Sequence, residues 1–446
     1  MKLNIYDALK KYSKQKAKRF HMPGHKGKRN TLFSSVAKYD ITELDFSDNL
    51  LSPYGIIKKS QEEISAILGS KQSYFVTDGS SIAIFSMIYA VKDLGNSLLI
   101  FKNSHKSVYN ALNLFNIKGD ILCGEDENGL PQILDLNSVE EYFINNKDSI
   151  GILVTYPDYY GQLIDLKELK KLTLKYEKLL LVDGAQGGHF NYLNENEIYA
   201  GKYADIWVDG VHKSMPALTQ GAVLSLSNQN LRIGVEKGLN VFRTTSPSYL
   251  IMASIEYSVK YLSEKGKKSL NKISSQVKSL QKDEKFDCFY KGNQDPTRLV
   301  LDAFKLGVDG EKLSIHLKNK NIYYELFDGR YIVFLFSANT KVKEIKYLKK
   351  IILSYFKKNQ STVKESLNLK SVNSQCEINF SSKEKVLVDF EESIGKISAE
   401  NIMVVPPCTP VILAGEVITK DKIYKLQISE GVILGLTDNK ISVLKE

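Results

Sequence analysis

The sequence predicts an α/β protein whose large domain is doubly wound around a mainly parallel sheet. Short, continuous apolar runs recur through residues 51–285, and helix-like segments lie between them. Such runs are typical of strands that are buried on both faces, because helices cover both sides of a parallel sheet. Each run ends in a loop of small and polar residues, which is where sheets of this class bind ligands. Residues 286–446 predict a smaller C-terminal α/β domain.

The expected elements follow the chain in order. The large domain has five apolar runs that predict strands, at residues 74–76, 97–101, 149–157, 179–185 and 205–210. Helix-like patterns cover residues 82–91 and 166–178, and a long helical linker is expected over residues 249–283. The small domain is predicted from strands at 298–304 and 331–337 and helices at 312–318 and 341–358.

Two segments do not fit either domain. Residues 1–50 hold one amphipathic stretch, 5–12, and predict an arm that packs on other parts of the protein. Residues 359–378 are rich in Ser, Asn and Lys and predict a loop, which sets a sub-boundary inside the small domain.

Composition narrows the class of protein. Hydrophobic residues make up 43% and charged residues 25% of the 446 positions, as in ordinary globular proteins. We expect neither a signal peptide nor a membrane span, since no stretch approaches about 20 apolar residues. The cysteines lie far apart without a C-x-x-C pair, which favours a reducing, cytoplasmic location; they are Cys123, Cys288, Cys376 and Cys408.

The formal net charge of +10 raises nucleic acid as a partner. The positive charge is nearly all lysine, and these lysines are spread along predicted helix faces rather than clustered. A nucleic-acid reader usually gathers Arg or Lys on one face. The charge therefore favours a solvated surface that attracts small anions over a nucleic-acid partner.

Lys213 is the candidate nucleophile. It lies in "WVDGVHKSMPALTQG", between apolar runs at 204–208 and 222–226 and directly after His212. A lysine nucleophile must lose its proton near neutral pH, and burial and nearby positive charge lower its pKa. A lysine in a surface loop is the plain alternative, but the flanking strands favour a position at the end of a buried sheet.

Asp183 ends the apolar run "LLLVDGA". A buried carboxylate needs a partner, although a turn or cap role would also explain it. A lysine and a carboxylate at neighbouring strand ends suit pyridoxal phosphate: the lysine holds its aldehyde as a Schiff base, and the carboxylate keeps its ring nitrogen protonated. The sequence therefore predicts this cofactor.

A phosphate cup is predicted at "TDGSS" (77–81), where a strand ends and a helix begins. Gly79 allows close approach of the backbone, Ser80 and Ser81 offer hydroxyls, and the helix N-terminus offers amides. His105 ends the next strand and would stack on the cofactor ring. Each loop alone is weak evidence, and a capping or structural role is the alternative for each.

Other ligand motifs do not fit. "GAQGGH" comes too late in the sheet for a dinucleotide fingerprint, and "GHKGKR" lacks the first glycine of a P-loop. His21 and His25 are separated by Pro23 and Gly24, so they do not share a helix face as zinc ligands would. No metal site is expected.

Together these motifs resemble one family, the Orn/Lys/Arg decarboxylases, which are fold type I pyridoxal-phosphate enzymes, in a short form without the N-terminal wing domain. The resemblance implies an aspartate-aminotransferase-like large domain. The segments that carry it span nearly the whole chain: "FHMPGHKGKR", "LLSPYGIIKKSQEEISAILGS", "YFVTDGSSIAIFSMI", "NSHKSVYNAL", "TYPDYYGQLIDL", "LLVDGAQGGHF", "HKSMPALTQGAVL", "RTTSPSYLIMASIE" and "PPCTPVILAGEVIT".

The resemblance also implies residue roles. Lys213 would form the Schiff base, His105 would stack on the ring, and Asp183 would pair with the ring nitrogen. Ala185 would pack under the ring and Gln186 would donate to its phenolic oxygen. The implied phosphate contacts are Gly79, Ser80, Ser81 and His212. The "TTSPSY" loop (244–249), with Thr245, and the N-terminal "HMPGH" (21–25) would complete the site of a partner subunit.

The sequence departs from the family pattern in four loops. "DGAQG" (183–187) stands where D-E-A-H-G or D-E-A-W is usual, and Gly210 and Val211 replace a serine and a threonine. Asp78 replaces the asparagine of T-N-G, and Cys408 replaces the glycine of P-P-G.

The implied reaction is α-decarboxylation of arginine, lysine or ornithine to an amine, a polyamine precursor, and carbon dioxide, by a homodimer or an assembly of dimers with shared active sites. Glu416 is a candidate to hold the substrate's distal cation. Two alternatives stay open because of the altered loops. One is another pyridoxal-phosphate reaction, transamination or aldol cleavage, and the other is a decayed protein that binds the cofactor or an amino acid without turnover.

Overall fold

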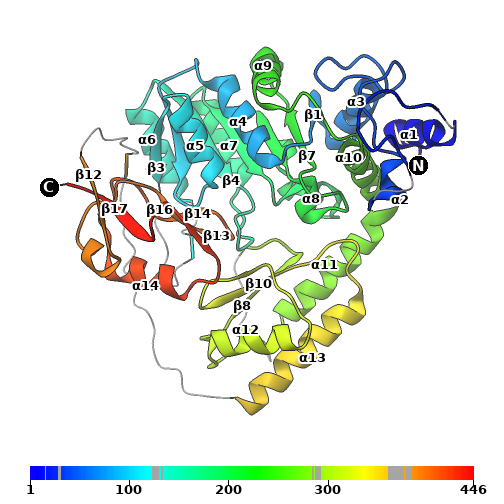
Figure 1. Cartoon of the computed structure of the whole chain (residues 1–446). Helices are drawn as coiled ribbons and strands as arrows, with labels where there is room; N and C mark the ends of the chain where they lie inside the picture. The colour runs from blue at the N-terminus through cyan, green and yellow to red at the C-terminus, as the bar shows by residue number, and fades with distance from the viewer. Residues whose placement is uncertain are drawn as a thin grey trace. The chain divides into compact units, whose positions relative to one another are not determined.

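The structure is a computed structural model that describes residues 1–15, 17–28, 32–122, 130–131, 134–283, 286, 293–359, 376–377 and 384–445. The chain forms two compact units, and Figure 1 labels their helices and strands. The first comprises Met1–Leu94, Leu166–Leu174 and Leu179–Asn271, and the second comprises Gly95–Asp165, Lys175–Lys178 and Lys272–Glu446. Each unit is described by itself, and the domain boundaries expected from the sequence stay predictions.

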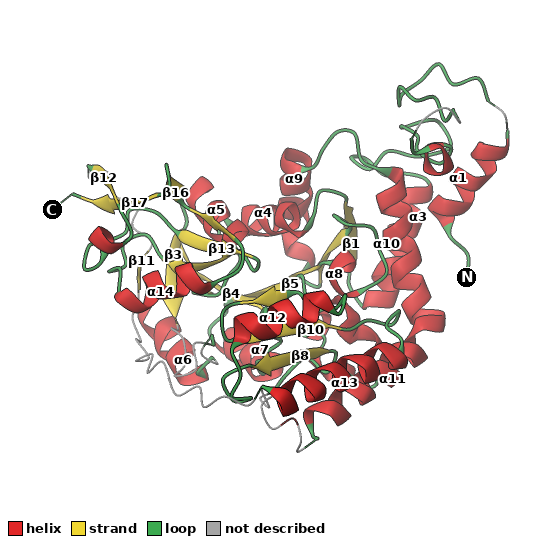
Figure 2. Cartoon of the chain, turned by 60° about the horizontal axis from the view of Figure 1, so that its bottom comes forward, coloured by secondary structure: helices red, strands yellow, loops and turns green. Residues whose placement is uncertain are grey.

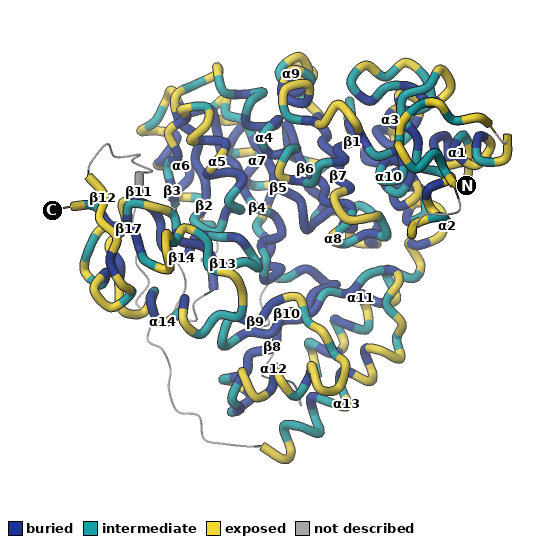
Figure 3. Tube along the Cα trace, in the orientation of Figure 1, coloured by how far each residue is buried: buried dark blue, intermediate teal, exposed yellow. Residues whose placement is uncertain are grey.

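Within its described residues, the first unit holds four strands of the main sheet, in the order β1-β7-β6-β5. They are β1 (Gln72–Val76), β5 (Leu179–Gly184), β6 (Ile206–Asp209) and β7 (Ala222–Leu226). β5 and β6 are parallel, whereas β7 runs antiparallel to both β1 and β6. Beyond the first residues of β1 and β5 these strands are buried throughout (Figure 3), as their continuous apolar runs predict.

Helices surround these strands (Figure 2). The helices of the first unit are α1 (Asn4–Lys14), α2 (Ser34–Ala37), α3 (Ile56–Leu68), α4 (Ser80–Val91), α7 (Leu166–Lys175, whose last residue belongs to the second unit), α8 (Val211–Ser214), α9 (Arg232–Phe242) and α10 (Tyr249–Tyr261). α10 continues through a single π turn (Leu262–Gly266) into α11 (Lys267–Gln281), which enters the second unit. This run confirms the long helix expected over residues 249–283.

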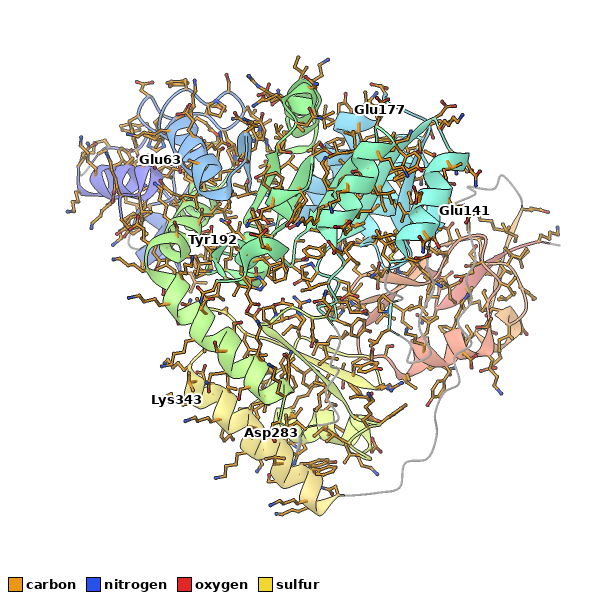
Figure 4. The ribbon with its side chains drawn as sticks, turned by 180° about the vertical axis from the view of Figure 1, so that it is seen from behind. Glu63, Glu141, Glu177, Tyr192, Asp283 and Lys343 are labelled. Atoms are coloured by element: carbon orange, nitrogen blue, oxygen red, sulfur yellow. The ribbon has the colours of Figure 1, made fainter. Side chains whose placement is uncertain are left out.

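The N-terminal helix packs within the first unit. The backbone N–H groups of Asn4 and Ile5, at the start of α1, donate to the carboxylate of Glu256 on α10, at 2.6 and 2.9 Å. Lys260 pairs with the same carboxylate at 3.0 Å and with Glu63 on α3 at 2.5 Å (Glu63 is labelled in Figure 4). A buried acid that caps a helix and pairs with a buried lysine therefore fixes the expected arm.

The second unit holds the other strands of the main sheet among its described residues, in the order β4-β2-β3-β11. They are β2 (Ser97–Phe101), β3 (Lys118–Leu122), β4 (Ser149–Thr155) and the two-residue β11 (Cys376–Glu377). β2 is parallel to β3 and β4, and β11 pairs antiparallel with β3. The connecting helices are α5 (Lys106–Leu114) and α6 (Leu136–Asn145); Asp135 caps α6 by accepting from two of its first backbone N–H groups.

The C-terminal part builds on three small antiparallel sheets, in the orders β8-β10-β9, β12-β17-β16 and β14-β13-β15. Their strands are β8 (Arg298–Asp302), β9 (Leu326–Phe327), β10 (Tyr331–Leu335), β12 (Lys385–Val388), β13 (Ile402–Val405), β14 (Thr409–Ile412), β15 (Val432–Leu434), β16 (Leu436–Thr437) and β17 (Lys440–Leu444). The helices are α12 (Gly310–Asn319), α13 (Val342–Lys358) and α14 (Lys420–Ile428). Two apolar cores form here, one around β8, β10, α12 and α13 and one around β13, β14 and α14.

Most expected elements are confirmed, with ends that move by one to three residues. Most of the loop predicted over residues 359–378 lies outside the described residues, as do Cys123 and Cys288. Cys408 is buried and is not in a disulfide. In the part of the chain that the structure describes, no helix is both long enough and apolar enough to cross a membrane.

Candidate active site

Lys213 lies in a single helical turn, α8, between β6 and β7. The turn is fixed by its backbone: the N–H of Lys213 donates to the carbonyl of Gly210 at 2.9 Å, and the N–H of His212 donates to the carbonyl of Gly221 at 3.1 Å. The position at a strand end is as predicted. The expected burial is wrong, because the Lys213 side chain is exposed while the strands on either side of it are buried.

Asp183 lies near the end of β5, the strand next to β6, and its partner in the register is Val208. Only 2% of its surface is exposed, and its Oδ1 accepts from the N–H of Ala185 at 3.1 Å. Burial raises the pKa of Asp183, while attraction to Lys213 and the hydrogen bond from Ala185 lower it. Buried Asp183 and exposed Lys213 therefore interact electrostatically.

The loop predicted to be a phosphate cup lies at the N-terminus of the twelve-residue helix α4. Gly79 precedes it with a φ of +86°, a backbone conformation that glycine adopts without strain. The Ser80 hydroxyl is buried and has no hydrogen-bond partner among the described residues. Ser81 lies beside it in the first turn. An orphaned hydroxyl at a helix N-terminus is what a bound anion would satisfy.

Gly210 faces this cup. A Cβ at Gly210 would lie 2.3 Å from the carbonyl oxygen of Ala185 and 2.9 Å from the Ser80 hydroxyl. The backbone before Lys213 thus approaches both the loop after β5 and the start of α4, so the three loops form one compact group. Ala185 and Gln186 in the loop after β5 are both buried.

His212 is half-buried, and its Nδ1 lies 2.9 Å from the carbonyl oxygen of Gly221. Burial lowers the pKa of His212, and the nearby charge of Lys213 lowers it further. The Gly221 carbonyl therefore holds both the ring and the backbone of His212, and its hydrogen bond to the ring partly opposes the lowering of the pKa.

His105 belongs to the second unit, where it caps α5. Its Nδ1 lies 3.2 Å from the backbone N of Ser107, which donates to it, and 2.8 Å from the Ser107 hydroxyl. The next backbone N–H, of Lys106, donates to the carbonyl of Cys408 at 3.0 Å. These contacts fix the imidazole ring, and its stacking on a cofactor stays a prediction.

Residues 4–295 match the major domain of the Orn/Lys/Arg decarboxylases. The chain belongs to the Orn/Lys/Arg decarboxylase family. This is a family of pyridoxal-phosphate-dependent decarboxylases of basic amino acids.

Relatives of known sequence match nearly the whole chain. The uncharacterized protein YaaO of Bacillus subtilis is 30% identical over 456 residues, which cover 96% of this chain and 94% of that protein. An arginine decarboxylase of Bacillus anthracis is 28% identical over 94% of this chain and 91% of its own length.

Solved structures show the same fold. The lysine decarboxylase LdcF of Francisella novicida superposes with a TM-score of 0.79 at 19% identity, over 99% of this chain and 81% of that one. The constitutive lysine decarboxylase of Escherichia coli gives a TM-score of 0.74 at 18% identity, over 100% of this chain and 82% of that one. The fold is therefore the fold type I architecture of pyridoxal-phosphate enzymes, with small C-terminal sheets added, as the sequence predicts.

The residues present fit the family's cofactor. The Ser80 hydroxyl and the helix N-terminus suit its phosphate, Asp183 suits its ring nitrogen, and Lys213 is exposed where an aldehyde can reach it. The family's serine at position 210 would not fit this backbone without a shift, because its Cβ would overlap Ala185. The assignment of these residues as site residues stays a prediction.

Thr245 lies in the exposed loop between α9 and α10, where the Thr244 hydroxyl accepts from the N–H of Ser246 at 3.1 Å. In the N-terminal "HMPGH", His21 bonds the hydroxyl of Tyr12 at 2.7 Å and His25 bonds Asp40 at 3.1 Å. Their expected role in a partner's site stays a prediction.

Glu416 is already paired within the second unit. Its carboxylate lies 2.9 Å from Lys102 and 2.7 Å from Lys422, and these two charges hold its pKa below the ordinary value despite burial. A carboxylate between two ammonium groups is a poor ligand for a third cation, so the structure does not favour Glu416 as the distal subsite.

Two charged residues near the site were not predicted. Asp209 ends β6 and is 2% exposed, and Arg243 follows α9 and is 8% exposed. The sequence carried a signal for Asp209, since a carboxylate ending an apolar strand needs a special environment. Arg243 has no such signal, because its burial depends on helix packing. Among the described residues, no cluster of three or more His, Cys, Asp or Glu could hold a metal ion.

Proposed function

We propose that the protein uses pyridoxal phosphate to remove the α-carboxylate of a basic amino acid, with arginine as the first candidate. The observation that carries the proposal is the pair formed by buried Asp183 and exposed Lys213 at neighbouring strand ends. The orphaned hydroxyl of Ser80 at the start of α4 supports it.

The chain's own residues have distinct tasks in this reaction. The start of α4, with Ser80 and Ser81, binds the phosphate through a hydroxyl and backbone amides. Asp183 would hold a proton on the ring nitrogen, and its burial would strengthen that contact because water is excluded. The bound cofactor supplies an electron sink for the pair left on Cα when carbon dioxide leaves.

Lys213 has two tasks in the proposed reaction. Its exposed Nζ would hold the cofactor through its aldehyde. The same amine would carry the proton that Cα gains after carbon dioxide leaves. The single turn of α8, held by Gly210 and Gly221, keeps its backbone in place while the side chain moves.

Substrate choice rests on the relatives. The Bacillus anthracis and Bacillus subtilis relatives at 28% identity are named arginine decarboxylases and are matched over more than 90% of their length. This favours arginine over lysine and ornithine, and all three belong in the assay.

We further propose a homodimer that shares its active sites. The exposed loop 244–246, which ends α9 and leads into α10, offers Thr245 to a neighbouring subunit. Light scattering should give at least twice the mass of one chain, and a monomer at assay concentration would contradict this part of the proposal.

The deciding experiment uses the purified protein with added pyridoxal phosphate. We expect a visible absorbance from covalently bound cofactor, and carbon dioxide release from arginine, lysine or ornithine. Lys213→Ala should lose both signals, whereas Lys237→Ala, an exposed lysine on α9, should keep them.

The other outcomes separate the alternatives. A keto acid or an aldehyde in place of carbon dioxide would indicate transamination or aldol cleavage. Bound cofactor without any product would indicate a binding protein. Absence of cofactor binding would refute the proposal as a whole.

A further inference from the structure

Helices α4 and α9 of the first unit pack against each other. A Cβ at Gly238 on α9 would lie 2.9 Å from Ser86 Cα on α4, and one at Gly234 would lie 2.7 Å from the carbonyl oxygen of Ala90. Small residues at such contacts allow two helix backbones to approach closely. The glycines therefore fix the register of the two helices.

The two helices run antiparallel. As the number on α9 rises from 234 to 238, its neighbour on α4 falls from Ala90 to Ser86. The ring of Phe242, one turn further, packs edge-on against Phe85 with a centroid distance of 5.6 Å. The end of α9 therefore lies beside the N-terminal half of α4, the half that begins at the predicted phosphate cup.

Arg243 is the residue that follows α9 at this end. It is 8% exposed, and its Nη1 donates to the carbonyl of Phe75 at the end of β1, at 3.3 Å. Its Nε has no hydrogen-bond partner among the described residues. Burial lowers the pKa of Arg243 to about 10, and attraction to Asp78 is the largest influence that opposes this shift. The guanidinium thus stays charged at neutral pH.

Asp78 lies three residues beyond Phe75, whose carbonyl accepts from Arg243. It lies between Thr77 and Gly79 in the loop that leads into α4, and the Thr77 hydroxyl donates to it at 3.1 Å. A phosphate dianion at the start of α4 would be repelled by a carboxylate at this position. The repulsion is strong where water is partly excluded.

We propose that Arg243 is a positioning residue of the cofactor site: its buried charge offsets that of Asp78 and so allows a phosphate group to bind at the N-terminus of α4. This rests on the proposed function, since it assumes that pyridoxal phosphate binds there. It explains how the chain carries an acid where the family commonly has asparagine. Arg243 acts through space, held in place by the α4–α9 packing.

The test compares two ligands on four proteins: wild type, Arg243→Met, Asp78→Asn and the double variant. The ligands are pyridoxal phosphate and pyridoxal, which lacks the phosphate, and the measurement is the dissociation constant from cofactor absorbance. Arg243→Met should weaken binding of pyridoxal phosphate about tenfold or more, and leave pyridoxal nearly unchanged. Added salt should shrink the difference, because it screens charge.

The double variant shows whether Arg243 acts by compensating the charge of Asp78 or only by supporting the structure. In the double variant the acid and its counter-charge are both gone, so the affinity for pyridoxal phosphate should return close to that of the wild type. Arg243→Lys keeps the charge and should bind as the wild type does. Arg232→Met is the control on the same helix, because Arg232 is exposed and paired with Glu236.

Two results would overturn the inference. One is an Arg243→Met variant that binds pyridoxal phosphate as tightly as the wild type, and the other is a double variant that stays as weak as Arg243→Met. Both would leave the proposed function intact. A wild-type protein that binds no pyridoxal phosphate would instead refute the proposed function and this inference together.

Discussion

Asp209→Asn tests the electrostatics beneath the lysine turn. Asp209 ends β6, four residues before Lys213, and its Oδ2 accepts from the hydroxyl of Tyr199 at 2.8 Å and from the indole N–H of Trp207 at 3.1 Å. Its Oδ1 has no hydrogen-bond partner among the described residues. Neither Tyr199 nor Trp207 carries a positive charge that could offset the carboxylate of Asp209. The substitution keeps the shape of the side chain and removes its ionisation.

The expected change in the free energy of unfolding follows from the pKa of Asp209. Burial raises it from an ordinary 3.8 to about 7, against the opposing hydrogen bonds. The folded chain therefore binds more protons than the unfolded chain between about pH 4 and 7, and stability falls as pH rises through this window. The total cost of the charge above pH 7 is about 4 kcal/mol, at about 1.4 kcal/mol per pH unit.

The asparagine variant does not carry this cost. It has a fixed penalty of its own, about 1–3 kcal/mol, since its amide N–H groups face a site without an acceptor. That penalty does not vary with pH. The stability of the variant relative to the wild type should therefore improve by about 4 kcal/mol between pH 4 and pH 8, whatever the offset.

Trp207 allows the titration to be followed in the folded protein. It is the chain's only tryptophan, it is fully buried, and it donates to Asp209 directly. Wild-type fluorescence should change with a midpoint near pH 7, and Asp209→Asn should show no such step. Tyr192 and Tyr199 stay neutral throughout, since burial and the nearby acid raise the pKa of each well above its usual range (Tyr192 is labelled in Figure 4).

Unfolding midpoints of the two proteins from pH 4 to 8 supply the stability comparison. A difference that is constant with pH, together with a wild-type fluorescence that is flat from pH 5 to 9, would refute the reasoning. The Asp209 carboxyl would then be charged over the whole pH range, either because a positive group compensates it or because water reaches it.

Two other substitutions test the packing of the first unit. Gly210→Ser should lower thermal stability by about 1–3 kcal/mol, because its Cβ would overlap the Ala185 carbonyl; an unchanged melting temperature would show that the backbone yields freely. Lys260→Met should cost about 3–5 kcal/mol in urea unfolding, since it leaves the buried carboxylate of Glu256 without its cation. The matched change at Lys171, an exposed partner in an i,i+3 pair, should cost less than about 0.5 kcal/mol, and an equal loss in both variants would contradict the argument.

The main sheet was predictable because its signal is local. Buried parallel strands appear as short apolar runs, and the run at 97–101 matches β2 at both ends. The run at 205–210 becomes β6, one residue shorter at each end. Lys213 and Asp183 could be chosen from the sequence because the rule that ligands bind at strand ends needs only strand positions.

Burial of single side chains was less predictable. Lys213 was expected to be buried because apolar strands flank it, yet the single turn of α8 turns its side chain outward. Arg243 looks like an ordinary charged residue at a helix end, and it is buried because two glycines bring α9 against α4. Such burial depends on contacts between segments more than 100 residues apart, which no local pattern contains.

The departures from the family pattern gain a physical meaning from these contacts. Gly210 lacks a hydroxyl that the family uses, but it leaves room for Ser80 and Ala185. Asp78 places an acid beside the phosphate cup, and buried Arg243 attracts it. A site that had decayed would accumulate changes without regard to their neighbours, so each change would leave an overlap or an uncompensated charge. Two of the four altered loops, those of Gly210 and Asp78, have neighbours that accommodate the change. This accommodation supports the proposed cofactor site, and it makes turnover, rather than binding alone, the quantity that the carbon dioxide assay has to decide.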